Sequence, residues 1–179
     1  MPDDPKRRGR ARWALLGVAL AVIAIDLITK QLTTSYLANR ESVRLLGGTV
    51  YLLHVRNAGA AFSLGQSYTF VFPLVACVVV GWIAWMSRRL ASLPWAIALG
   101  LVLGGALGNL SDRIFRAPGP FVGHVVDMIS VFGDHGERFP VFNIADSALT
   151  CGVVLAVLLE FTGRRRDGIR ESRQSDDRE

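Results

Sequence analysis

Residues 13–32 read WALLGVALAVIAIDLITKQL, an apolar stretch whose charged residues are Asp26 and Lys30. About 20 mostly apolar residues suffice for a helix to cross the hydrocarbon core of a bilayer. The stretch therefore predicts a transmembrane helix. Asp26 and Lys30 are four residues apart and share one helix face. They form either a self-neutralising pair, with Lys30 reaching the membrane interface, or part of a polar site.

Three further apolar stretches have spanning length, at 68–86, 94–110 and 141–162. Hydrophobic residues make up 51% of the 179 residues and charged residues 20%, whereas about a quarter is charged in soluble domains. The mean hydropathy is +0.35, which argues against a disordered chain and an ordinary soluble enzyme. The sequence predicts an all-α membrane protein with four transmembrane helices, in which 1–162 form a single domain and 163–179 a charged, disordered tail.

Basic residues set the predicted orientation. The chain has 20 Lys and Arg against 15 Asp and Glu, a formal net charge of +5. Most basic residues precede the first span, follow the last, or lie in the short loop at Arg88 and Arg89. By the positive-inside rule, both termini and this loop face the cytoplasm and the two longer loops face outward. The membrane topology thus accounts for the basic net charge, and nucleic-acid binding is not needed to explain it. For the first apolar stretch, a cleaved signal peptide is the alternative to a transmembrane helix.

The two longer loops contain strand-like segments. Residues 43–55 are rich in β-branched and aromatic residues around Gly47 and Gly48, which predicts a hairpin. Residues 122–132 are also strand-like. The sequence therefore predicts a small β-rich subdomain on the outer membrane surface. An interfacial amphipathic helix is the alternative for parts of these loops.

Polar residues gather near the outer ends of the predicted spans. Asn57 and Gly59 lie in a loop of small residues, typical of a turn or of a place where backbone approaches a ligand. Gly108 stands in a small-xxx-small pattern, which predicts close helix packing. Asn109 and Arg113 share a face near the end of the third span. Arg113 either anchors to lipid headgroups or orients a carbonyl or carboxylate in a site.

Two aspartates are the strongest candidates for chemistry. Asp146 follows Asn143 by three residues, and a helix over 141–162 would place it about 7 Å into the span. A carboxylate there must be protonated, paired or in a wet cleft, which favours a functional role. Asp127 is a lone carboxylate in an apolar outer segment, where capping a loop is the alternative role. The residues alone leave open whether Asp127 and Asp146 meet.

Two carboxylates that approach closely share a proton, because both cannot ionise cheaply. Aspartic proteolysis requires this arrangement: one acid activates water and the other protonates the carbonyl oxygen or the leaving amine. The sequence has no HExxH motif and no Cys/His cluster, and Cys77 and Cys151 lie in apolar runs. No GxSxG motif supports a serine nucleophile. We therefore expect neither a metal nor a cofactor.

Five short blocks match, in order, the pattern of bacterial lipoprotein signal peptidases, also called signal peptidase II. They are DLITK at 26–30, NAGAAFS at 57–63, GGALGNLSDR at 104–113, VVD at 125–127 and FNIADS at 142–147. Each block is weak alone, whereas five in order across a four-span chain are specific. The chain resembles this family over about residues 14–162.

The resemblance implies an intramembrane aspartic endopeptidase of the bacterial cytoplasmic (inner) membrane. Such enzymes remove the signal peptide from diacylglyceryl-modified prolipoproteins by cutting just before the lipidated cysteine. By the family pattern, Asp127 and Asp146 are the catalytic pair. The implied substrate-binding and supporting residues are Asp26, Lys30, Asn57, Gly59, Gly108, Asn109, Arg113 and Asn143. The implied partners are prolipoproteins, membrane lipid and globomycin-type inhibitors, and we expect a monomer.

Two other classes of function remain as alternatives. A small proton-coupled transporter would use the carboxylates as a proton relay. Such a site is expected near the bilayer midplane, whereas the polar residues here cluster near one surface. A structural or anchoring protein is the other alternative, and it predicts that Asp127→Asn and Asp146→Asn are tolerated.

Overall fold

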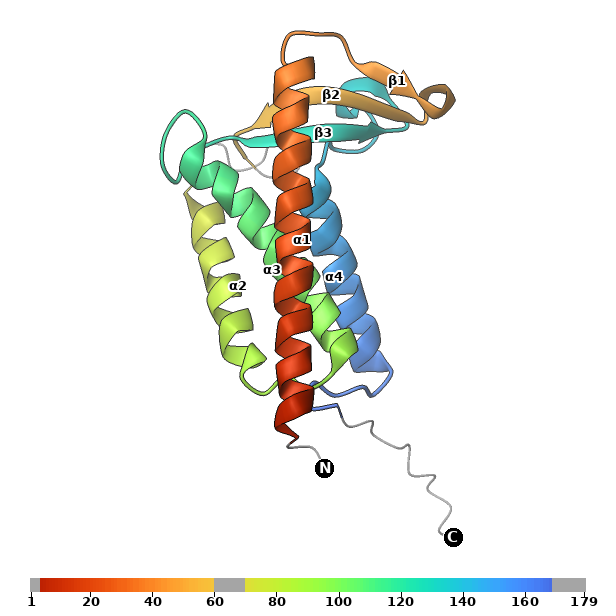
Figure 1. The fold of residues 1–179 in the computed structure, drawn as a ribbon. Helices are drawn as coiled ribbons and strands as arrows, with labels where there is room; N and C mark the ends of the chain where they lie inside the picture. Colours follow the sequence, from red (N-terminus) through yellow and green to blue (C-terminus); the bar gives the residue numbers. More distant parts are fainter. Residues whose placement is uncertain (1–3, 60–69, 169–179) are drawn as a thin grey trace.

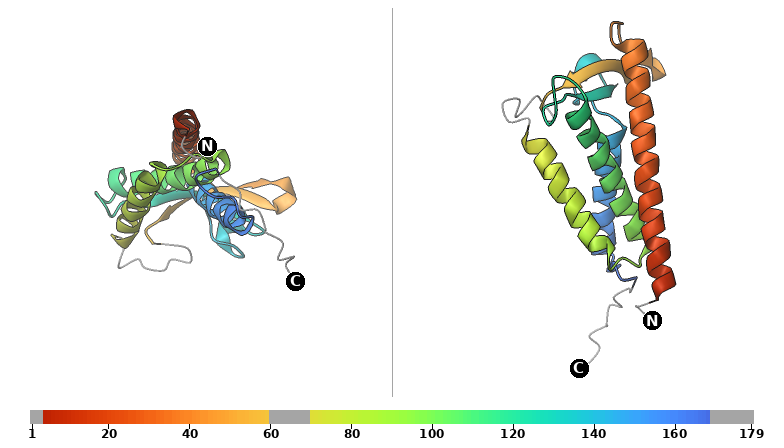
Figure 2. Two further views of the ribbon diagram at one scale, coloured as in Figure 1. Left: turned by 90° about the horizontal axis from the view of Figure 1, so that it is seen from below. Right: turned by 60° about the vertical axis from the view of Figure 1, so that its left-hand side comes forward.

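The computed structural model describes residues 4–59 and 70–168. In these residues, four helices run side by side and a small sheet lies across one end of the bundle (Figure 1). The described ends of the chain lie at the opposite end of the bundle, as two further views also show (Figure 2). The helices are α1 (Pro5–Leu37), α2 (Val71–Ser87), α3 (Leu93–Phe115) and α4 (Ile144–Phe161).

Three of the helices, α1, α3 and α4, are long and apolar enough to cross a membrane. Helix α2 is also apolar but has 17 residues. The start of the second predicted span, 68–69, lies outside the described residues. The first and third apolar stretches are helical throughout, the second is helical from Val71 on, and the fourth is helical over 144–161 but not at 141–143. Many large apolar side chains face outward, such as Leu20 with 66% exposure and Trp85 with 66%, as expected for a lipid-facing surface.

The starts of α1 and α4 depart from the predicted stretches because polar N-cap side chains set them. Helix α1 extends beyond 13–32 at both ends and begins after Asp4, whose carboxylate accepts the Lys6 N–H at 2.9 Å. Helix α4 begins at Ile144 rather than at 141, because the Asn143 side chain accepts the Asp146 N–H at 2.9 Å. An N-cap side chain replaces a backbone partner that the first helical turn lacks.

Helix α3 lies at the centre of the bundle and packs against α1, α2 and α4. Its glycines permit this close approach. A Cβ on Gly104 would lie 2.7 Å from Cβ of Val22, and a Cβ on Gly108 would lie 2.7 Å from an Asp26 carboxylate oxygen. The predicted packing role of this small-residue pattern is therefore confirmed.

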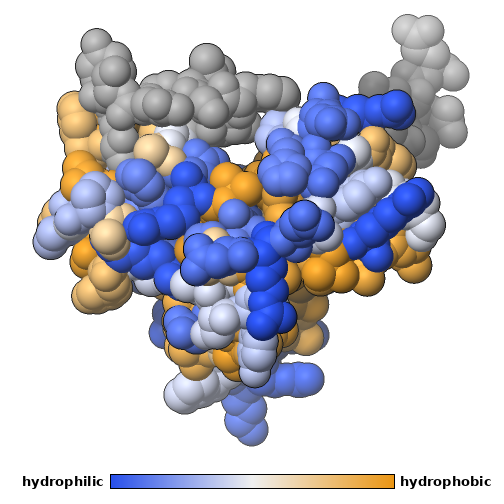
Figure 3. All heavy atoms as spheres, turned by 90° about the horizontal axis from the view of Figure 1, so that it is seen from above, coloured by the Kyte–Doolittle hydropathy of each residue, from blue (hydrophilic) through white to orange (hydrophobic). Residues whose placement is uncertain are grey.

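The sheet is antiparallel in the order β1 (Val43–Leu45), β2 (Val50–Asn57) and β3 (Val125–Val131). The predicted hairpin is confirmed, and Gly47 and Gly48 supply its turn with φ of 67° and 98°, which glycine adopts without strain. Strands β2 and β3 pair so that Val55 lies opposite Asp127 and Asn57 lies opposite Val125. Seen from the sheet end, polar side chains cover much of this face, with apolar side chains among and around them (Figure 3).

The first residues of the predicted tail are ordered by hydrogen bonds to the rest of the chain. The backbone carbonyl of Arg166 accepts the N–H groups of Ala91 and Ser92 at 2.9 and 3.1 Å. The Trp95 indole N–H donates to the carbonyl of Arg164 at 2.6 Å. Residues 163–168 therefore dock on the start of α3. Residues 169–179 lie outside the described part of the chain.

Candidate active site

Asp127 lies on β3 with its side chain turned into the molecule. Its residue is 3% exposed. One carboxylate oxygen accepts the Asn57 amide N–H at 2.9 Å, and the other accepts the Asn143 amide N–H at 2.7 Å. Both donors come from other segments, β2 and the residue before α4, so tertiary contacts fix the orientation of this carboxylate.

Asp146 lies in the first turn of α4, closer to the helix end than the sequence predicts. Because α4 begins at Ile144, Asp146 is the N3 residue of a capping box: its Oδ2 accepts the Asn143 backbone N–H at 3.1 Å. Its Oδ1 accepts the Asn109 amide N–H at 2.8 Å. The carboxylate is therefore held by α3 and by its own helix start.

Asn143 connects the two aspartates. Its amide nitrogen donates to Asp127, while its amide oxygen accepts the backbone N–H of Asp146 at 2.9 Å. Asn143 is fully buried. Within 4–59 and 70–168, no hydrogen bond joins the two carboxylates directly. A shared amide thus holds the acids close together while leaving room between them.

Both aspartates line one cavity of about 720 Å³. Its polar lining includes Asn57, Asn109 and Arg113 beside the two acids. The rest of the wall is mostly apolar and comes from α2, α4 and the segment before α4; it includes Phe72, Pro73, Ala76, Phe139, Val141 and Phe142. A largely apolar cavity with a few convergent polar groups is typical of a ligand or active site.

Burial changes the protonation of Asp127. Burial is the main cause that raises the pKa of this carboxyl to about 7, and the negative charge of Asp146 contributes to this rise. The hydrogen bond from Asn57 opposes the rise, because it stabilises the ionised form. Near neutral pH, Asp127 is therefore divided between its protonated and ionised forms. A carboxyl in this state can donate a proton or receive one.

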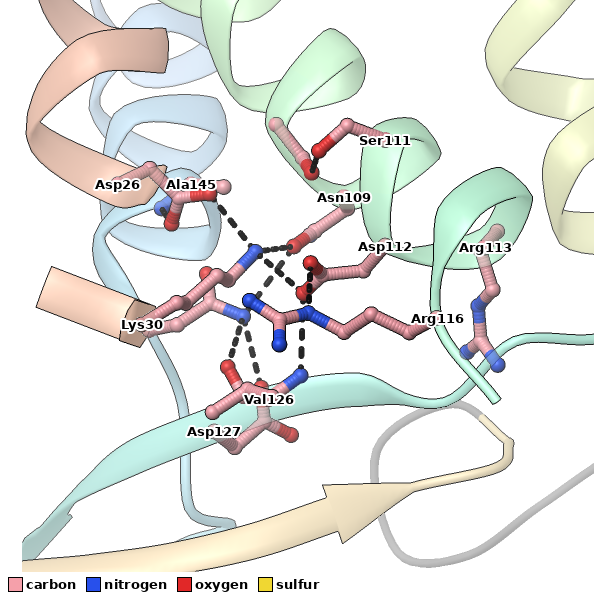
Figure 4. A network of polar contacts seen from close by, with 12 residues as sticks. Asp26, Lys30, Asn109, Ser111, Asp112, Arg113, Arg116, Val126, Asp127 and Ala145 are labelled. Atoms are coloured by element: carbon pink, nitrogen blue, oxygen red, sulfur yellow. Dashed lines mark hydrogen bonds and ion pairs between the residues drawn. The ribbon is translucent and has the colours of Figure 1, made fainter. Parts of the chain in front are cut away.

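A buried cluster of charged side chains lies behind the amide of Asn109, which donates to Asp146 (Figure 4). The Lys30 ammonium donates to the Asn109 amide oxygen at 3.0 Å and contacts Asp26 at 2.7 Å and Asp112 at 3.0 Å. Lys30 is 0% exposed. The alternative in which Lys30 reaches the membrane interface is therefore wrong. Its charge instead fixes which end of the Asn109 amide faces Asp146.

Asp112 is a functional candidate that the sequence analysis missed. Its carboxylate accepts the Val126 N–H at 3.1 Å, next to Asp127, and also pairs with Arg116. The residue is 2% exposed. Two signals were available: Asp112 stands inside the block at 104–113, and Arg116 follows it by four residues on the same helix face.

Asp26 lies behind the site rather than on the cavity wall. One of its carboxylate oxygens accepts the Ala145 N–H at 2.9 Å, at the start of α4, and the other pairs with Lys30. The Gly108 position leaves space for this carboxylate. Asp26 therefore joins α1 to α4 through a charge-assisted hydrogen bond and positions the helix that carries Asp146.

Arg113 holds the loop that follows β2. Its guanidinium donates to the backbone carbonyls of Ala58, Gly59 and Gly123 at 3.0, 2.6 and 3.1 Å. It is 5% exposed, so the headgroup-anchor alternative is wrong. Asn57 accepts the Gly59 N–H at 2.9 Å and helps to hold the same loop. The continuation of this block, 60–63, lies outside the described residues.

The charges around the site nearly balance. The acids are Asp26, Asp112, Asp127 and Asp146, and the bases are Lys30, Arg113 and Arg116. One proton on the aspartate pair makes the cluster neutral, which is the favourable state for buried groups. Among the described residues, no group of three or more His, Cys, Asp or Glu side chains is placed to hold a metal ion.

Comparisons with known proteins identify the family of the chain. Residues 18–162 match the family model described as Signal peptidase (SPase) II. The lipoprotein signal peptidase of Streptomyces coelicolor is 49% identical over 166 residues, which are 92% of this chain and 79% of that protein. That of Mycobacterium avium is 47% identical over 174 residues, or 97% of this chain and 91% of that protein.

A solved structure described as a bacterial membrane enzyme, determined by the in meso method at 2.3 Å resolution, has the same fold. It superposes with a TM-score of 0.73 at 27% identity, covering 89% of this chain and 94% of that one. The apolar bundle, the cavity with its acids and these matches define a membrane peptidase. The chain belongs to the signal peptidase II family.

Proposed function

We propose that this chain is an intramembrane aspartic endopeptidase that removes the signal peptide from diacylglyceryl-modified prolipoproteins, cutting just before the lipidated cysteine. The observation that carries the proposal is the placement of Asp127 and Asp146 in one cavity, bridged by the Asn143 side chain. The name of the relatives, lipoprotein signal peptidase, supports the substrate class.

The two acids have different roles in the proposed reaction. Asp127, whose pKa is raised to about 7 by burial, carries the proton and donates it to the scissile carbonyl oxygen. Asp146 accepts a proton from the attacking water, so the water oxygen adds to the carbonyl carbon. In the collapse step, Asp146 gives its proton to the leaving amine, the C–N bond breaks, and one hydroxyl of the tetrahedral intermediate returns its proton to ionised Asp127 as the new carboxyl group forms. The pair then returns to one shared proton.

The supporting residues keep this geometry fixed. Asn109 and Asn143 donate to the carboxylates, and Lys30 orients Asn109 from behind. Arg113 holds the carbonyls of Ala58 and Gly59 at the cavity wall. We propose that Asn109 and Arg113, which line the cavity, align the substrate backbone beside the acids, and that the buried Lys30 and Asn143 support them from behind. Preorganised donors need no rearrangement during reaction.

The apolar wall of the cavity fits the proposed substrate. A prolipoprotein presents an apolar signal helix and acyl chains, which would lie against Phe72, Phe139 and Val141. Globomycin-type inhibitors are expected to occupy the same cavity. We propose that a monomer suffices, because one chain supplies both carboxylates.

For the membrane topology we propose four spans in the bacterial inner membrane, in which α2 crosses the membrane as well as α1, α3 and α4. Both termini would face the cytoplasm by the positive-inside rule. The sheet lies at the end of the bundle opposite the described chain ends (Figure 1). The cavity is lined by Asn57 of β2, Asp127 of β3 and Asp146 at the start of α4, at the same end. This arrangement would put the active site near the outer face, where the proposed cleavage point at the end of a signal helix is also expected.

A cleavage assay tests the proposed reaction. The purified protein in detergent is given a prolipoprotein with or without the diacylglyceryl group, in buffer containing a chelator. Mass spectrometry then identifies the new N-terminus. We expect cleavage before the lipidated cysteine in the presence of chelator and at least tenfold slower cleavage of the unmodified substrate. Loss of activity in chelator, or cleavage elsewhere, would contradict the proposal.

A further inference from the structure

A second cavity, of about 430 Å³, lies at the end of the bundle opposite the aspartates. The start of α1, the connection from α2 to α3 and the docked segment 163–168 form its walls. Four arginines line it, namely Arg7, Arg10, Arg164 and Arg165. None of its lining residues is acidic. Arg165 pairs with Asp167 at 3.8 Å outside the lining, so the cavity wall still carries an excess of positive charge.

The backbone of the tail holds two of these arginines in place. The Arg166 carbonyl accepts N–H groups from Ala91 and Ser92, and the Arg164 carbonyl accepts the Trp95 indole N–H. The Arg166 guanidinium stacks over the Trp95 ring, 5.0 Å from its centroid. Arg164 and Arg165 are therefore fixed by their backbone opposite Arg7 and Arg10 of α1, despite mutual repulsion between like charges.

The start of α3 adds to the positive field in this cavity. Ser92, Leu93 and Pro94 line the cavity at the N-terminal end of a 23-residue helix. This end of a helix carries the positive pole of its dipole. Ser92 does not use its side chain to cap the helix. Four guanidinium groups and a helix N-terminus together favour a bound anion.

Apolar surface lies directly beside these charges. Leu93 lines the cavity and is 41% exposed, and Ile97, one turn further along α3, is 43% exposed. A soluble anion would gain nothing from this surface, whereas a lipid places its phosphate among the arginines and its acyl chains along the helix. A neighbouring cavity shares Arg164 and Arg165 with this one, but its lining also includes the acidic residues Glu160 and Asp167.

We propose that this cavity, lined by Arg7, Arg10, Arg164 and Arg165, binds the phosphate group of an anionic phospholipid. Basic pockets between the ends of transmembrane helices are suited to such headgroups. The bound lipid neutralises the repulsion between the tail and α1, so it strengthens the docking of 163–168. The site is distinct from the aspartate cavity and does not depend on the peptidase reaction.

Native mass spectrometry of the full chain in detergent tests the proposal. The protein is titrated with dioleoyl-phosphatidylglycerol and, separately, with dioleoyl-phosphatidylcholine, which has the same acyl chains and no net charge. We expect saturable binding that favours phosphatidylglycerol. Arg7→Gln/Arg10→Gln should weaken this binding by roughly 30-fold, because each arginine near an anionic headgroup contributes about one factor of five. The matched control, Arg40→Gln/Arg138→Gln, loses the same charge at the sheet end and should bind as the wild type does.

Three results would overturn the proposal. One is equal binding of the two lipids by the wild type. Another is a variant Arg7→Gln/Arg10→Gln that binds phosphatidylglycerol as tightly as the control variant. The third is displacement of the lipid by millimolar glycerol 3-phosphate, which would assign the cavity to a soluble phosphate instead.

Discussion

Replacing Lys30 should destabilise the protein more than any single surface change, because it leaves two buried carboxylates without their shared cation. The ammonium lies 2.7 Å from Asp26 and 3.0 Å from Asp112, and all three groups are almost fully buried. At these distances the attraction is about 6 kcal/mol per pair for an effective dielectric constant near 20. Most of this attraction offsets the cost of burying the charges.

The net cost of Lys30→Met follows from what remains. Asp112 keeps Arg116, whereas Asp26 keeps the Ala145 N–H as its hydrogen-bond donor. Breaking a buried ion pair on one side costs about 3–5 kcal/mol. We expect a loss of this size in the free energy of unfolding. The double variant Lys30→Met/Asp26→Asn removes the orphaned charge and should recover most of the loss.

Unfolding in mixed micelles, followed by circular dichroism as the denaturing detergent is increased, measures these differences. Lys6→Met at an exposed position is the matched control and should change little. The double variant Lys30→Met/Asp26→Asn separates stability from positioning. It should fold, yet cleave roughly 100-fold more slowly, because the Asn109 amide oxygen loses its charged donor and keeps only the Asn143 amide at 3.2 Å. The reasoning fails if Lys30→Met is as stable as Lys6→Met, or if the double variant is no more stable than Lys30→Met.

Gly108→Ala should lower the free energy of unfolding, because its Cβ would lie 2.7 Å from an Asp26 oxygen. Gly17→Ala is the control: its Cβ would have nothing within 4 Å, so it should raise the free energy of unfolding by about 0.5–1 kcal/mol. Thermal unfolding measures both variants, and equal shifts in the two would contradict the packing argument. The pH profile of kcat/KM should fall as pH rises through about 7, because Asp127 must be protonated to donate. Asn57→Ala should move this fall to higher pH, since the Asn57 hydrogen bond lowers the pKa of Asp127; a fall at unchanged or lower pH would refute that assignment.

Protonation of Asp127 also links stability to pH. Its pKa in the folded protein, about 7, exceeds the ordinary value of 3.8. Between these values the folded state binds more protons than the unfolded state. The free energy of unfolding should therefore be greatest at low pH and decline as pH rises from about 4 to about 7, as far as this group decides it.

The apolar stretches predicted each of the four described α-helices, because the length and composition needed for a span are local properties of the sequence. The helix ends were harder, since single side chains set them. Asn143 accepts the Asp146 N–H and starts α4 three residues later than the apolar pattern predicts. The docking of 163–168 was missed because it depends on the backbone of the α2–α3 connection, far away in the sequence.

For the site, the spacing of Asp26 and Lys30 correctly predicted a shared helix face. It could not predict that Lys30 is buried, because that depends on Asp112 and Asn109 of α3. The juxtaposition of Asp127 and Asp146 was likewise open from the residues alone. The family resemblance supplied the pairing, and β3 packing above the start of α4 brings both into one cavity. Their catalytic role remains a proposal.

The most direct test of the account is the cleavage rate of Asp127→Asn and Asp146→Asn beside Asp134→Asn, an aspartate of the outer segment away from the cavity. Thermal unfolding of each variant in detergent establishes that it is folded. The account predicts a loss of about 100- to 10,000-fold for each cavity variant and a near wild-type rate for Asp134→Asn. Because the two acids act as a unit, the variant Asp127→Asn/Asp146→Asn should be no slower than the slower of the two single variants. A folded Asp127→Asn or Asp146→Asn variant with full activity would contradict the central claim.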